Sequence, residues 1–318
     1  MPSDPSYFVV GCHGWSGSYW LAHALNLHPE LTVSHSAENL LAVGPDLHDL
    51  ERLKATVQSL HHGMQARQRK PIDATFDEIE AMGDTPVYGA VHVFRLRDLP
   101  VQLKAFGAFK RPYVLANLVR HPVSFAWSGY GQLRDMFTFD IFVLRGTLNL
   151  ILSAEDFIFP LAKRHDLNLA DFEVASFLGG CANMLNLAQD VAVGRDVSHI
   201  KMESVTTDPE LFAKVVSYLS GGKVTADATY LDAVYSTGEI NKHRKGTSRM
   251  GPSERYESFS PWQKEAFNFF LAASGIRAPY ESLGYDFSFV DKKGARFKGD
   301  VVSKSPLAAA VAEVASSL

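Results

Sequence analysis

The stretch from Tyr7 to Pro29, YFVVGCHGWSGSYWLAHALNLHP, constrains the fold more than any other part of the sequence. It begins with a short apolar run typical of a buried strand and continues into a loop rich in glycine and serine. One face of an amphipathic helix then carries Trp20, Leu21, Ala24 and Leu25. A strand–loop–helix unit directs backbone N–H groups and the positive end of a helix dipole at one point, where a phosphate is the usual ligand. No Lys follows Gly17, so this is not the phosphate loop of an ATP- or GTP-hydrolysing enzyme.

Strand-like runs alternate with helical patterns along the rest of the chain. We predict strands at Tyr7–Gly11, Pro86–Val93, Tyr113–Leu118 and Val197–Met202. We predict helices at Trp20–Leu27, Asp46–Ala66, Leu99–Phe109, Asp171–Ala192 and Pro209–Leu219, and another that begins after the N-cap Ser260 at Pro261. This alternation predicts an α/β fold with a central parallel sheet flanked by helices. We expect a single domain over residues 1–290, with a long polar loop at 234–258 and a tail at 291–318.

Composition narrows the class of partner. The 318 residues are 46% hydrophobic and 21% charged with a net charge of −4, which is ordinary for a soluble protein and unfavourable for nonspecific nucleic-acid binding. Cys12, a small buried loop residue in this interpretation, and the distant Cys181 make neither a disulfide framework nor a zinc site. The N-terminus has no basic leader, and no apolar stretch reaches the ~20 residues that span a bilayer. We therefore expect a cytoplasmic protein without a membrane or nucleic-acid partner.

A second pattern, LVRHP, follows the predicted strand at 113–118. Arg120 stands at the end of that strand, and Ser128 lies eight residues further on, about two turns into a helix that starts at Pro122. An Arg at a strand end and a helix Ser can together bind one phosphate. A surface Arg with an unrelated helix-interior Ser is the alternative.

A third pattern, His243-Arg244-Lys245-Gly246, lies in the polar loop. Cations beside a glycine suit an anion whose oxygens meet backbone amides. A solvated run of charge is the alternative interpretation.

The order and spacing of these three patterns resemble the sulfotransferase family that uses 3′-phosphoadenosine 5′-phosphosulfate (PAPS), in its cytosolic or bacterial small-molecule form. His28-Pro29 and the stretch IKMESVTTDPELFAKVVSYL also fit, so the resemblance runs from about Tyr7 to Tyr285. It implies the P-loop NTPase-like architecture of sulfotransferases. It also implies transfer of a sulfuryl group from PAPS to a hydroxyl or amine of a small molecule by in-line displacement, with adenosine 3′,5′-bisphosphate (PAP) as product and no metal.

The resemblance also implies the residues of the donor site. The first loop, which would hold the 5′-phosphosulfate, consists of His13, Gly14, Trp15, Ser16, Gly17, Ser18 and Tyr19. Trp20 stands where cytosolic members stack a Trp on adenine. The 3′-phosphate would be held by Arg120, Ser128, Arg244, Lys245 and Gly246.

Two residues compete as the general base that takes the acceptor's proton. His92 ends the predicted strand VYGAVH where cytosolic members have a catalytic His, and imidazole titrates near working pH. Glu38 lies shortly after His28-Pro29, where Golgi and several bacterial members place a catalytic Glu, and His35 is a weaker competitor. A structural strand-end His and a helix N-terminal acid are the respective alternatives.

The sequence departs from the family pattern at two cations. Trp15 and Ala90 occupy positions where the family carries Lys or Arg. Either His13, Arg95 or Arg97 supplies the charge from another direction, or the donor binds somewhat differently. The alternatives are a weak or inactive relative that only binds PAPS or PAP, and a P-loop-type small-molecule kinase. The segment 129–180, rich in Phe and Leu, is predicted to line an apolar or aromatic acceptor, although core packing explains these residues equally well. Whether the protein forms a homodimer is left open.

Overall fold

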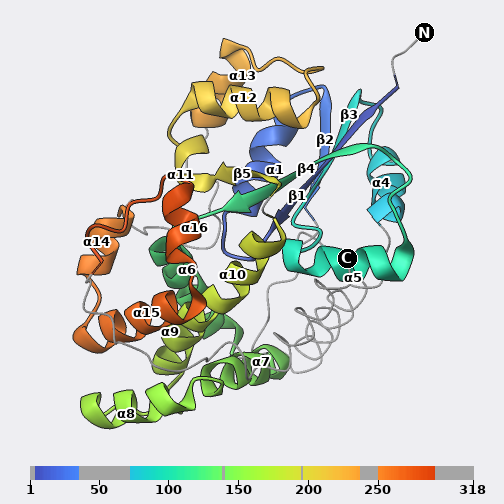
Figure 1. The fold of residues 1–318 in the computed structure, drawn as a ribbon. Helices are drawn as coiled ribbons and strands as arrows, with labels where there is room; N and C mark the ends of the chain where they lie inside the picture. The colour runs from blue at the N-terminus through green and yellow to red at the C-terminus, as the bar shows by residue number, and fades with distance from the viewer. Residues whose placement is uncertain (1–3, 36–71, 138–139, 195, 237–249, 291–318) are drawn as a thin grey trace, which may run out of the picture. The chain divides into compact units, whose positions relative to one another are not determined.

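The computed structural model describes residues 4–35, 72–137, 140–194, 196–236 and 250–290 (Figure 1). The chain divides into two compact units. Of the described residues, 4–35, 72–120, 193–194 and 196–236 form the sheet unit, and 121–137, 140–192 and 250–290 form the helical unit. The expectation of one domain over residues 1–290 stays a prediction.

The sheet unit is built on five parallel strands: β1 (Ser6–Cys12), β2 (Leu31–His35), β3 (Val87–Val91), β4 (Tyr113–Val119) and β5 (Ser198–Lys201). Their order is β2-β3-β1-β4-β5 (Figure 1). The predicted α/β fold with a central parallel sheet is therefore confirmed. The chain leaves the central β1 for the edge strand β2, returns to β3 beside β1, and then crosses to β4 on the other side. Ligands of open α/β sheets bind at the carboxyl ends of the strands beside such a reversal.

Helices cover both faces of this sheet. They are α1 (Ser18–Asn26), α4 (Ile72–Glu80), α5 (Leu99–Phe106), α11 (Met202–Val205), α12 (Pro209–Leu219) and α13 (Ala228–Ser236), with a 3₁₀ turn η1 (Leu96–Asp98). Figure 1 shows α12 and α13 on one side of the sheet and α4 on the other. Phe8 and Val10 of β1 pack into a core cluster with α1 and α12, whereas Val9 packs with α4. Burial on both faces explains why β1 is a continuous apolar run and not an alternating one.

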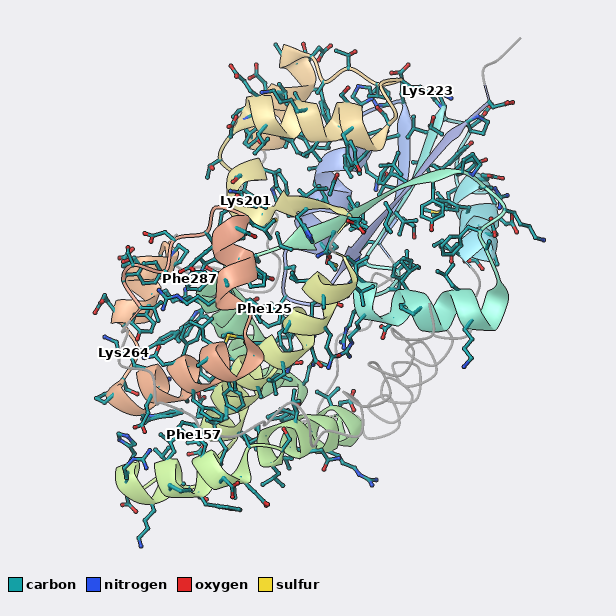
Figure 2. All side chains as sticks on the ribbon, viewed as in Figure 1. Phe125, Phe157, Lys201, Lys223, Lys264 and Phe287 are labelled. Atoms are coloured by element: carbon teal, nitrogen blue, oxygen red, sulfur yellow. The ribbon has the colours of Figure 1, made fainter. Side chains whose placement is uncertain are left out.

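The helical unit contains α6 (Pro122–Met136), α7 (Ile141–Leu152), α8 (Glu155–His165), α9 (Phe172–Ala182), α10 (Met184–Val193), α14 (Pro252–Glu257), α15 (Pro261–Ser274) and α16 (Arg277–Ser282). Its interior is aromatic. Phe125 and Phe157, labelled in Figure 2, are buried, and the Phe157 ring stacks on Phe269 with centroids 3.8 Å apart. No described helix has both the length and the apolar character needed to cross a membrane.

Several sequence predictions of elements are confirmed. The helix α12 has the predicted bounds, and α15 begins at Pro261 behind a capping box formed by Ser260 and Gln263. The first helix begins at Ser18, two residues before the predicted Trp20, and Pro122 starts α6.

Other predictions of elements are wrong. The expected loop at 234–258 contains the end of α13 and all of α14. The polar composition of this segment concealed α14, which has Pro252 in its first turn. The expected helix Asp171–Ala192 is two helices that meet at Asn183, whose side chain bonds to the Gly179 carbonyl and competes with the helical ladder. Cys12 is the buried last residue of β1 and not a loop residue. The helix expected at Asp46–Ala66 and the tail at 291–318 lie outside the described residues.

Candidate functional site

The candidate site lies at the carboxyl edge of the sheet, beside the reversal at β1. Because all five strands are parallel, the segments that follow them emerge at one edge. The loop 13–17 follows β1, His35 ends β2, His92 follows β3 and Arg120 follows β4. Four candidates separated widely in the sequence therefore share one edge of the sheet unit.

Two residues at this edge have a strained backbone. Among the described residues that are not glycine, only Trp15, His92 and Asp166 have positive φ, at 72°, 64° and 50°. Such conformations cost about 1–3 kcal/mol each and cluster at functional sites. Two of these three residues thus fall at the sheet edge that the topology marks for ligands, and one of them is the predicted general base.

Gly17 ends the loop and caps α1 in the left-handed conformation, with φ 87°. A Cβ atom at this position would lie 2.5 Å from Cε of Met202, the residue that follows β5. Glycine is therefore required twice, for its backbone conformation and for the close approach of Met202. The group that approaches Gly17 is a side chain of the same unit, and a role of Gly17 in binding a ligand stays a prediction.

The N-terminus of α1 begins at Ser18 directly behind this turn. Gly17 makes no side-chain cap, and the first turn carries no acidic residue. The first N–H groups of a helix have no intrahelical acceptor, and the dipole favours negative charge there. The sheet unit therefore presents a helix N-terminus whose chemistry suits an anion.

Arg120 connects the end of β4 to the loop. Its Nη1 donates a hydrogen bond of 2.9 Å to the carbonyl oxygen of Trp15. A charged donor makes this bond stronger than a neutral one. The structure thus brings together the first predicted motif and the Arg of the second, which are 105 residues apart in the sequence.

His13, the first residue of the loop, is buried, with 2% of its surface exposed. Its Nδ1 lies 3.1 Å from the Gly14 carbonyl oxygen, which only accepts, so Nδ1 is the donor. Burial, followed by the charges of Arg95 and Arg97, holds the pKa of His13 well below its usual range. His13 is therefore neutral at pH 7 and does not supply the positive charge missing at Trp15. Of the three predicted substitutes, Arg95 and Arg97 remain, and their role stays a prediction.

A cluster of rings lies beside the loop. His35 Nε2 and Ser18 Oγ are 3.0 Å apart in a buried contact. The His35 ring has the His92 ring at 5.3 Å and the Tyr19 ring at 5.7 Å between centroids. The backbone N–H of His92 donates to the Val10 carbonyl, which fixes the turn after β3. The structure therefore places the preferred base candidate beside the weaker one.

The remaining members of the first loop differ in exposure. Ser16 is buried, while Gly14 and Tyr19 are half-buried. The half-buried Trp20 packs against Phe212 and Tyr235, with ring centroids 5.5 and 6.4 Å apart. One part of its indole thus belongs to the core, and its stacking on adenine stays a prediction.

The described structure does not test the other predicted site residues. Ser128 is half-buried on α6 in the helical unit, so its pairing with Arg120 stays a prediction. Glu38, Arg244, Lys245 and Gly246 lie outside the described residues.

Sequence reasoning missed the strand β2 and therefore underrated His35. The segment LTVSH alternates buried and half-buried residues, and its β-branched Thr32 and Val33 were an available signal. It also missed Lys201, which pairs in register with Val119 and so lies at the same edge as Arg120.

Comparisons with known proteins add no assignment. A scan against protein-family models and a search of curated proteins both return no match for this chain. Among the described residues, no group of three or more His, Cys, Asp or Glu side chains is placed to hold a metal ion.

Proposed function

We propose that the protein is a sulfotransferase that moves a sulfuryl group from PAPS to a hydroxyl or amine of a small-molecule acceptor. The observation that carries the proposal is the loop between β1 and α1, which joins an uncapped helix N-terminus to Arg120 at the carboxyl edge of a parallel sheet. The choice of PAPS as the donor comes from the sequence resemblance. The strand order β2-β3-β1-β4-β5 supports the proposed P-loop-like architecture.

The charge at this edge suits the donor. PAPS carries roughly four negative charges: about −2 on the 3′-phosphate monoester, and about −1 on each of the phosphate and the sulfate of the 5′-phosphosulfate. Arg95, Arg97 and Arg120 belong to the segments that follow β3 and β4, and Lys201 is the last residue of β5. The chain as a whole has a net charge of −4, so the local gathering of cations is not a consequence of composition.

The proposed reaction is an in-line displacement at sulfur. The acceptor oxygen or nitrogen forms a bond to sulfur while the bond from sulfur to the 5′-phosphate oxygen breaks, and that oxygen keeps the electron pair. The acceptor's proton passes to a general base. The N–H groups at the start of α1 and the nearby arginines would stabilise the negative charge that develops on the departing phosphate.

His92 is the base that the described residues favour. It directly follows β3, is half-buried, and holds a strained conformation beside the loop. Glu38 remains the competing candidate. The segment 129–180, which is predicted to line the acceptor, includes α7 and α8 and the buried Phe157 and Phe177, and its contact with the acceptor stays a prediction. A homodimer and a cytoplasmic location stay predictions.

A second candidate function is binding of PAPS or PAP without transfer. The specific observation in its favour is that Trp15 replaces a loop cation while its neighbour His13 is held neutral by burial. Removing one comparable electrostatic contact costs about 10²–10³ in rate. This candidate predicts that PAP binds and that phenols, alcohols and amines all fail to accept a sulfuryl group.

Calorimetric titration with PAP tests the donor site, with ATP and magnesium as the control nucleotide. We expect micromolar binding of PAP by the wild-type protein and none of ATP. Arg120→Ala should abolish the binding because it removes both a cation and the bond that holds the Trp15 carbonyl. Lys214→Ala, which removes an exposed cation on α12, is the matched control and should bind like wild type. Undiminished affinity in Arg120→Ala would reject the site, and magnesium-dependent ATP binding would favour a kinase.

A further inference from the structure

A buried hydrogen bond joins the second strand to the start of the first helix. His35, the last residue of β2, places Nε2 3.0 Å from Oγ of Ser18, the first residue of α1. The two side chains belong to residues with only 5% and 7% exposure. A buried bond of this kind holds its partners in a defined geometry, because breaking it leaves polar groups out of contact with water.

The His35 ring is fixed on two sides. Tyr19 meets it edge-on with centroids 5.7 Å apart, and the His92 ring lies at 5.3 Å. The register of the sheet pairs His35 with Val91, the residue before His92. Packing therefore aims the imidazole at Ser18 before any ligand binds.

We propose that His35 is a positioning residue of the donor site: its Nε2–H donates to Ser18 Oγ and thereby directs the Ser18 hydroxyl proton to the donor's anion. This inference rests on the proposed function. A serine hydroxyl has one proton to give and lone pairs to accept with. An anion only accepts, so Ser18 serves it by giving that proton. The bond between Ser18 and His35 must then run from the imidazole to the hydroxyl.

The arrangement compensates for a missing charge. A hydroxyl that accepts one hydrogen bond becomes a stronger donor of the next, because a chain of such bonds is mutually polarising. At a loop where Trp15 replaces the family's cation, a neutral donor strengthened by His35 adds stabilisation of negative charge. His35 itself touches Ser18 and not the reacting atoms, so it acts through Ser18.

The direction of the bond is measurable without any donor. Long-range ¹H–¹⁵N spectra of the ligand-free protein report which imidazole nitrogens carry a proton, and the His35 signals are assigned by their loss in His35→Gln. We expect a protonated Nε2 at pH 7.5. An Nε2 without a proton would mean that Ser18 donates to His35, and it would overturn the inference whatever the protein binds.

Calorimetric titration with PAP measures the consequence for binding. Ser18→Ala should weaken PAP binding by about tenfold or more, the usual value of a hydrogen bond to a charged group. His35→Leu should weaken it in the same direction, whereas His35→Gln, whose amide N–H can still donate, should stay within about threefold of wild type. The double variant Ser18→Ala/His35→Leu should bind no more weakly than Ser18→Ala alone, because His35 acts through Ser18.

A buried histidine elsewhere in the sheet unit serves as the control. His28 is a buried histidine whose ring packs on Tyr230 with centroids 4.8 Å apart, and His28→Leu should leave PAP affinity unchanged. Circular dichroism confirms that each variant is folded. Wild-type affinity in His35→Leu, or losses that add in the double variant, would overturn the inference. Failure of the wild-type protein to bind PAP would instead reject the proposed function, and the spectra would still decide the direction of the bond.

Discussion

At the scale of single residues, the site depends on backbone conformations that no sequence pattern displays. Glycine at position 17 is an understandable choice for a left-handed turn, but tryptophan at 15 and histidine at 92 are not. The sequence identified all three as site candidates from their order and their family resemblance. It did not reveal the strain, because φ is set by the surrounding turn and by contacts such as the bond from Arg120 to the Trp15 carbonyl.

The first residue-scale prediction concerns Gly17. Gly17→Ala should lower the free energy of unfolding by about 2 kcal/mol, because a left-handed conformation costs an L-residue roughly 1–2 kcal/mol and the new methyl meets Met202. Urea denaturation followed by circular dichroism measures the change. In a Met202→Ala background the same substitution should cost less, since only the backbone cost remains.

Gly14→Ala is the matched control in the same loop. A Cβ atom there would have no neighbour within 4 Å, and Gly14 is not among the residues with positive φ. We expect its stability to stay within about 0.5 kcal/mol of wild type, as for most substitutions that create no clash, cavity or backbone strain. Equal losses in Gly14→Ala and Gly17→Ala would show that the loop tolerates neither for reasons unrelated to Met202.

At the scale of elements, close helix packing explains an unusual run of small residues. The helix α9 contains Gly179-Gly180-Cys181-Ala182, and a Cβ atom at Gly180 would lie 2.4 Å from the Ala126 carbonyl oxygen of α6. The sequence marked this segment as helical without showing which glycine faces a neighbour. Periodicity gives a face of a helix, whereas the identity of the packing partner requires the tertiary structure.

Gly180→Ala should therefore be destabilising by about 1–3 kcal/mol, the range for overpacked sites, because the atom in its way is backbone and cannot rotate aside. Gly146→Ala in α7 is the control with opposite sign. A Cβ atom at that exposed position meets nothing within 4 Å, so higher helix propensity should raise the free energy of unfolding by about 0.5–1 kcal/mol. The two unfolding curves measure both effects, and a shift in the same direction would contradict the described packing of α6 and α9.

The short strand β2 shows the limit of predicting secondary structure from the sequence. The five residues of β2 include only Thr32 and Val33 as strand-forming β-branched residues, and this weak signal becomes a strand through pairing with β3. Because β2 was not predicted, His35 had no predicted place in the sheet, and its contact with Ser18 was not predicted either. By contrast, β1 and β4 are long buried runs, and the positions of their following loops were predicted correctly.

At the scale of the whole molecule, the alternation of strands and helices predicted a parallel sheet, and parallel strands place the ends of β1, β3 and β4 at one edge. The parallel sheet explains why the loop 13–17, His92 and Arg120, which the family resemblance assigned to one site, lie at the same edge. The strand order was not predictable, because it depends on which strands pair and not on their local sequences. Pairing of β1 with both β3 and β4 is what places the loop at the reversal of the sheet.

The pH dependence of stability provides a test of how the sheet unit encloses His13. Burial and the neighbouring arginine charges hold the pKa of His13 well below 6.5 in the folded protein, while the unfolded chain titrates near that value. Below pH 6.5 the unfolded state therefore binds a proton that the folded state does not bind, and the free energy of unfolding falls as the pH falls. The contribution of His13 to the free energy of unfolding then falls by up to about 1.4 kcal/mol per pH unit.

Between pH 7.5 and 5.5, urea denaturation should show the wild-type protein losing about 1 kcal/mol more free energy of unfolding than His13→Asn, which lacks the titrating group. Equal losses in the two proteins would mean that His13 takes up a proton in the folded state, and hence that the loop between β1 and α1 can carry the positive charge that Trp15 does not provide.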